Sequence, residues 1–190
     1  TAKVPGGAIC AVMGCGGIGL NVIQGCELAG AAQIIAIDVV PGKLEMARSF
    51  GATHTINARQ DDPVKAVQEL TGGQGAEYAF EAIGNVDAAR QVFDMVRSGG
   101  TAVVVGMMPM GSEIRVPGPA FLSEKKLIGS MYGSTRFRDH MPRLVNLFMQ
   151  GRLNLWGLVS QRMGLADVNR AFELMKGGTV ARSVLDISQA

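Results

Sequence analysis

The residues best suited to chemistry are a glycine cluster at 14–19 and an aspartate that follows it. The cluster reads Gly-Cys-Gly-Gly-Ile-Gly, which fits the pattern G-x-G-x-x-G. In this pattern Gly14 permits a sharp turn, Gly16 lets a pyrophosphate approach the backbone, and Gly19 lets a helix pack closely on a sheet. The N–H groups and the positive dipole end of that helix then face the phosphates. Asp38 lies 19 residues after Gly19, where a carboxylate can accept hydrogen bonds from both hydroxyls of a ribose.

The predicted strands and helix around the glycines indicate whether this motif is a dinucleotide-binding site. Residues 8–13 favour a strand, and residues 17–29 carry apolar side chains at spacings of three and four, which predicts a helix. Residues 33–38 predict a second strand that ends at Asp38. The alternative is an ordinary strand, turn and helix whose glycines serve packing alone. The matching context on both sides favours a dinucleotide site.

The same aspartate selects the nucleotide. A carboxylate repels the 2′-phosphate of NADP, and the next two residues, Val39 and Val40, offer no arginine to bind one. The sequence therefore predicts NAD as the cofactor. Lys43 falls in the next predicted helix, where it is either a cofactor ligand or an ordinary solvated charge.

Strands and helices alternate along most of the chain. Further strands are predicted over 53–57, 78–83, 101–106 and 126–132, and further helices over 41–50, 62–71 and 86–97. This alternation predicts an α/β fold, a doubly wound parallel Rossmann sheet of six strands. A C-terminal helix and strand return segment follows, with helices over 138–150 and 166–176 and a strand over 182–187. We expect a Rossmann domain over 1–135 and a segment over 136–190 that packs back toward another domain.

Composition narrows the class of protein. Apolar residues make up 47% of the chain, which is ample for a core, and the net charge of +2 comes without a Lys/Arg cluster. We therefore expect no nucleic-acid or membrane partner, and no apolar run reaches the roughly 18 residues that a membrane span needs. The three cysteines form no C-x-x-C pair and only two histidines accompany them. They are expected to be small buried residues in a reducing compartment, the cytoplasm, with no metal ligand among them.

Two further features call for structural interpretations. Glu81 lies inside an apolar predicted strand, where a carboxylate needs partners, and we interpret it as a structural hydrogen-bonding group rather than a catalytic base. Residues 112–116, from Ser112 to Val116, are predicted to form a short extended segment, and the flanking residues are rich in proline. Such a segment suits the edge of a sheet, where it can pair with another subunit.

Several segments together resemble one family. The glycine cluster and the residues after it, CELAGAAQIIAIDVVPGKLEMARSFGATHTIN, are followed by FEAIG at 80–84, GSMYG at 129–133 and MKGGTVAR at 175–182. In this order they resemble the coenzyme-binding domain of zinc-containing medium-chain alcohol dehydrogenases, in the class I and class III branch. The resemblance covers nearly the whole chain and implies hydride transfer between an alcohol and NAD. The N-terminal catalytic zinc domain of that family has no counterpart here. We therefore expect a fragment of a longer protein, inactive alone, with no catalytic residue and with zinc only in the missing domain.

The family's cofactor contacts carry over to positions of this sequence. The resemblance implies that the glycines hold the pyrophosphate, that Asp38 binds the adenosine ribose with Lys43 beside it, and that Arg182 reaches the pyrophosphate. It also implies that the backbone of Val105, Ser130 and Tyr132 bonds the carboxamide of the nicotinamide. The full set of implied cofactor residues is Gly14, Gly16, Gly17, Ile18, Gly19, Asp38, Lys43, Ala82, Ile83, Val105, Ser130, Tyr132 and Arg182.

Alternatives remain at the level of substrate and of class. Within the enzymes, the parent protein is an alcohol dehydrogenase acting on a small alcohol or aldehyde, a thiol-dependent formaldehyde dehydrogenase or a polyol dehydrogenase. Outside them, a module that binds or senses NAD(H) without catalysis is the rival, and the nicotinamide segments at Val105 and Ser130 argue against it. We expect a homodimer or homotetramer through the sheet edge near Ser112 and Val116.

Overall fold

The computed structural model describes residues 1–178 and 180–189 and falls into two compact units. The first unit comprises Thr1–Phe137, and the second begins at Arg138. Thr179, inside the 175–182 motif, lies outside the described residues. No helix in the described part of the chain is long and apolar enough to cross a membrane.

The first unit is built on a six-stranded sheet with the order β3-β2-β1-β4-β5-β6. Its strands are β1 (Ile9–Met13), β2 (Gln33–Asp38), β3 (His54–Asn57), β4 (Ala76–Glu81), β5 (Val96–Val104) and β6 (Lys126–Gly129). All neighbouring pairs run parallel. The predicted doubly wound parallel Rossmann sheet of six strands is therefore confirmed.

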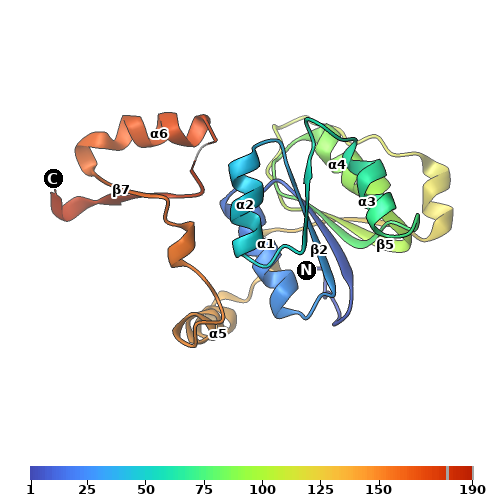
Figure 1. Cartoon of the computed structure of the whole chain (residues 1–190), viewed down its shortest axis with the longest axis horizontal. Helices are drawn as coiled ribbons and strands as arrows, with labels where there is room; N and C mark the ends of the chain where they lie inside the picture. The colour runs from blue at the N-terminus through green and yellow to red at the C-terminus, as the bar shows by residue number, and fades with distance from the viewer. Residues whose placement is uncertain (179, 190) are drawn as a thin grey trace. The chain divides into compact units, whose positions relative to one another are not determined.

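Four helices cover the two faces of this sheet. They are α1 (Gly17–Leu28), α2 (Pro41–Ser49), α3 (Pro63–Leu70) and α4 (Val86–Met95). Helices α1 and α2 lie against one face, and α3 and α4 lie against the other (Figure 1). Capping side chains begin α3 and α4. Pro63 of α3 follows the capping carboxylate of Asp62, and the side chain of Asn85 caps α4 by accepting from the N–H of Ala88.

The central strands β1 and β2 are apolar over most of their length because both faces of the sheet are covered there. Ala11 and Met13 of β1 belong to the core cluster that includes Val92 and Phe93 of α4. The three cysteines lie on β1, in the glycine turn and on α1, all buried as free thiols. Their predicted role as small core residues is confirmed.

The strand and helix ends differ from the predictions where long-range pairing decides them. The helix predicted to run to residue 97 ends at Met95, because Val96 is buried and already pairs with Ala76 of β4. The strand predicted over 126–132 stops at Gly129, since Tyr132 has a φ of +47° and begins a short 3₁₀ turn. The predicted end of one helix and the predicted end of one strand were therefore wrong.

The segment at 112–116 was predicted to be extended, but the structure assigns it to no strand. The N–H of Ser112 instead donates to the carbonyl of Pro109 in a turn. Prolines at 109, 117 and 119 lack the N–H that a ladder requires. A 3₁₀ helix, Gly118–Ser123, then leads into β6 at the edge of the sheet.

The second unit contains the return segment. Helix α5 (Phe137–Met149) leads into this unit, which holds β7 (Gln161–Gly164), α6 (Val168–Lys176) and β8 (Ser183–Asp186). Strands β7 and β8 form a parallel two-stranded sheet. The two helices and the last strand match the predicted elements to within three residues at each end, whereas β7 was not foreseen as a strand.

Candidate functional site

The glycine turn is held where β1 ends. Gly14 has a φ of +96°, a conformation open to glycine, and its N–H donates to the carbonyl of Ile37 at 2.8 Å. This hydrogen bond ties the turn to the end of β2. At Gly19 an added Cβ would overlap the carbonyl oxygen of Gly14. Glycine at position 19 is therefore what allows α1 to begin this close to the turn.

The start of α1 leaves room for an anion. Gly16 is the N-cap residue, and no described side chain caps the helix by a hydrogen bond. An added Cβ at Gly16 would meet no atom within 4 Å, and the first turn carries no acidic residue. The N–H groups of Gly17 and Ile18 begin the helix, where such groups lack intrahelical acceptors. The cradle fits a pyrophosphate group.

Asp38 stands beside this cradle and is bound to it. Its Oδ2 accepts from the N–H of Cys15 at 2.8 Å, so the carboxylate holds the glycine turn as well as ending β2. Its Oδ1 accepts from the N–H groups of Val39 and Val40, at 2.7 and 3.0 Å. The side chain is 9% exposed. A carboxylate has about four acceptor positions, so one remains to meet a hydroxyl.

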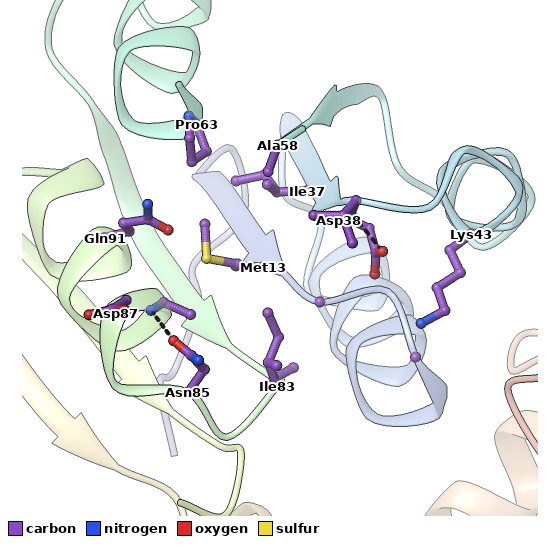
Figure 2. A pocket seen from close by; sticks show the side chains of 15 residues that line it. Met13, Ile37, Asp38, Lys43, Ala58, Pro63, Ile83, Asn85, Asp87 and Gln91 are labelled. Carbon is purple, nitrogen blue, oxygen red and sulfur yellow. Dashed lines mark hydrogen bonds between the residues drawn. The ribbon is translucent and has the colours of Figure 1, made fainter. Parts of the chain in front are cut away.

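These groups open into a cleft of about 540 Å³. The cleft lies at the carboxyl ends of β1, β2 and β4, which is the point where the strand order reverses and where such sheets bind ligands. Figure 2 shows Asp38 and Lys43 on one side and the α4 side chains on the other. Six of the residues predicted to bind cofactor line it: Gly14, Gly16, Asp38, Lys43, Ala82 and Ile83.

The remaining predicted residues lie outside the cleft lining. Gly17, Ile18 and Gly19 form the first turn of α1, and Ile18 is 54% exposed. The N–H groups of Val105 and Ser130 donate to the carbonyls of Glu81 and Val104. The backbone carbonyl oxygens of Val105 and Ser130 are therefore the groups that a ligand would contact.

Tyr132 is 88% exposed in the turn after β6. Arg182 belongs to the second unit, just before β8. Contacts of Tyr132 and Arg182 with a cofactor stay predictions.

The sequence interpretation missed the far end of the cleft. Nine other residues line it: Met13, Ile37, Val39, Ala58, Pro63, Asn85, Asp87, Ala88 and Gln91. Most of them follow the carboxyl ends of β3 and β4 or lie on the first turns of α4, as Figure 2 shows. The signal that finds them is the strand order, because parallel strands bring their carboxyl ends to one edge.

No cluster of three or more His, Cys, Asp or Glu side chains that could hold a metal occurs within residues 1–178 and 180–189. Zinc therefore does not fit the residues of this part of the protein. The cysteine nearest the cleft, Cys15, is 1% exposed and its thiol donates to the carbonyl of Ile37. Burial, followed by the negative charge of Asp38, raises the pKa of this thiol to about 12. It stays protonated and packs as a small apolar side chain.

Comparisons with known proteins agree with this geometry. A family model described as zinc-binding dehydrogenase matches residues 17–150. An S-(hydroxymethyl)glutathione dehydrogenase from Synechocystis is 39% identical over 187 residues, which are 97% of this chain and 51% of that protein. The chain thus spans about half the length of the curated relatives it matches.

Solved structures show the same half-length match. Benzyl alcohol dehydrogenase from Acinetobacter calcoaceticus superposes with a TM-score of 0.94 at 30% identity, over 98% of this chain and 51% of that one. A zinc-binding dehydrogenase from Sinorhizobium meliloti, bound to NADP, gives a TM-score of 0.82 at 25% identity, over 90% of this chain and 49% of that one. Because one such neighbour holds NADP, the choice of nucleotide has to come from the residues of the cleft.

Proposed function

This chain belongs to the zinc-binding dehydrogenase family, and from that membership we propose that it is the NAD-binding part of a zinc-dependent alcohol dehydrogenase. One observation supports the proposal most directly: Asp38 is hydrogen-bonded to the glycine turn, and the two line the same cleft. The Gly16 cradle offers backbone N–H groups to a pyrophosphate, and Asp38 offers an acceptor to the adenosine ribose. Bound NAD supplies a nicotinamide that accepts hydride from the substrate.

Asp38 and its neighbours support NAD over NADP. The carboxylate is fixed by three backbone N–H groups, so it cannot turn away from a 2′-phosphate. Val39 lines the cleft next to it, and an apolar side chain gives a 2′-phosphate no partner. Lys43 also lines the cleft, as a cation that either nucleotide can use.

Titration of this chain with NADH and with NADPH, followed by fluorescence, tests the proposal. We expect NADH to bind more tightly than NADPH. The matched variant is Gly16→Ala, whose added methyl group meets no protein atom within 4 Å. It should keep the fold yet weaken NADH binding by about tenfold, because the methyl group stands where the pyrophosphate approaches. Equal NADH affinity in the variant, or no binding by the folded wild-type chain, contradicts the proposal.

For the whole protein, we propose oxidation of a small alcohol to an aldehyde or ketone in the cytoplasm. A thiol adduct of formaldehyde is the second candidate substrate, which the name of the 39% identical relative supports. No side-chain cluster that could hold zinc occurs among the described residues, and we propose that the other half of the full-length protein supplies it. The rate of NAD reduction by the full-length protein with each substrate distinguishes the two.

We also propose that the protein forms dimers, or tetramers built from them, through the edge of the sheet. Strand β6 occupies that edge, and residues 112–116, which are flanked by prolines at 109, 117 and 119, precede it in the chain. The backbone groups of an edge strand are a template for pairing with a second copy. Sedimentation of the full-length protein should give at least a dimer, and a monomer counts against this proposal.

A further inference from the structure

Glu81 is a fully buried carboxylate that the hydride transfer itself does not use. It is the last residue of β4, and its side chain is 0% exposed. Its Oε1 accepts from the N–H groups of Ile83 at 2.7 Å, Gly84 at 2.6 Å and Asn85 at 3.3 Å. These residues form the turn between β4 and α4. The side chain thus supplies the acceptor that holds this turn in place.

The backbone of the same residue holds a second segment. The carbonyl oxygen of Glu81 accepts from the N–H groups of Val105 at 2.9 Å and Gly106 at 3.1 Å, just beyond the end of β5. In the sheet Glu81 is paired with Met13 of β1 on one side and with Val104 of β5 on the other. Glu81 therefore ties the turn after β4 to the chain that leaves β5.

The other carboxylate oxygen, Oε2, does not hold the described backbone as Oε1 does. Oε2 is buried without a hydrogen-bond partner among the described residues. An added Cβ at Gly106 would lie 2.7 Å from it, so Oε2 faces that glycine. Burying a carboxylate costs free energy that only its hydrogen bonds offset, and half of this group makes none. A gain in stability therefore explains a glutamate at position 81 poorly. The need to hold the turn after β4 in one conformation explains it directly.

Both segments that Glu81 ties together contain residues that we expect beside the cofactor. Ile83 and Asn85 line the cleft, and Val105 is the residue expected beside the nicotinamide. We propose that Glu81 is a positioning residue for NAD, fixing the cleft wall through Oε1 and the nicotinamide end through its carbonyl. This inference rests on the proposed function. Because Glu81 is completely buried, it cannot touch the substrate, and it is therefore not the catalytic base.

The test compares two glutamates on one strand. Glu81→Met keeps a side chain of similar length but leaves the three N–H groups without their acceptor, and NADH affinity should fall about tenfold. Glu81→Gln keeps an amide oxygen for those groups and should bind NADH within about threefold of wild type. Glu77→Met is the control, because Glu77 accepts from the N–H of Ile9 and from Arg97, away from the cleft. It should lower the melting temperature and leave NADH affinity unchanged.

Each outcome separates positioning from a purely structural role. A folded Glu81→Met variant that binds NADH as tightly as wild type overturns the inference while leaving the proposed function intact. If that variant does not fold, Glu81→Asp takes its place, since a carboxylate one methylene shorter draws back from the turn. Wild-type affinity in folded Glu81→Asp then overturns the inference too. A folded wild-type chain that binds no NADH overturns the proposed function, and the inference with it.

Discussion

Replacing Gly19 with alanine is expected to destabilise the fold and to remove most of the cofactor affinity. The new methyl group would overlap the carbonyl oxygen of Gly14 and lie 2.8 Å from the carbonyl carbon. Both are backbone atoms, so α1 or the glycine turn must move. Overpacking of this kind costs about 1–3 kcal/mol, which urea unfolding of the variant measures. Because the moving parts carry the pyrophosphate cradle, NADH affinity should fall by roughly tenfold to a hundredfold.

Gly25→Ala is the matched control on the same helix. Gly25 lies in the exposed middle of α1, and an added Cβ there meets nothing within 4 Å. Alanine is a better helix former than glycine, so this variant should gain about 0.5–1 kcal/mol and bind NADH like wild type. If Gly19→Ala retains wild-type stability and affinity, the close packing of α1 on the turn is not what the glycine provides.

The fold could be predicted because its signals are local. Strands β1 and β2 are short, mostly apolar runs, and helix α3 begins at a capping residue and a proline, Asp62 and Pro63. The glycine turn and Asp38 are 19 residues apart, which is the length of one helix and one strand, so their meeting follows from a single βαβ unit. Six of the predicted cofactor residues do line one cleft.

What escaped prediction depends on contacts between distant residues. Val96 looks helical from its neighbours, but pairing with Ala76 places it in β5. Ala58, Pro63 and Gln91 carry no motif, and they reach the cleft only because β3, β1 and β4 deliver their carboxyl ends to one edge. The hydrogen bonds of Glu81 link residues up to 25 positions apart. Periodicity along the chain does not encode these pairings, whereas strand order does.

Asp38→Asn is expected to lower the preference for NADH over NADPH by about a hundredfold. We expect the aspartate to serve two functions, because it accepts from the N–H of Cys15 in the glycine turn and lines the cleft in which we propose that the ribose binds. Asparagine keeps one oxygen and turns the other acceptor into a donor. If its oxygen stays with Val39 and Val40, the amide NH₂ confronts the N–H of Cys15. The glycine turn should therefore loosen, and both cofactors should bind more weakly in absolute terms.

The ratio of the two affinities isolates the ribose from this loosening. NADH and NADPH share the same pyrophosphate, so a distorted turn weakens both alike, whereas charge at the 2′ position distinguishes them. Losing the carboxylate removes the charge-assisted bond expected to a ribose hydroxyl and removes repulsion of a 2′-phosphate, and a hydrogen bond to a charged group is worth about 1.5–3 kcal/mol. Adding Val39→Arg to the same chain should reverse the preference, since Val39 lines the cleft and a guanidinium there can bind the phosphate. An unchanged ratio in Asp38→Asn would mean that the aspartate serves only to hold the turn.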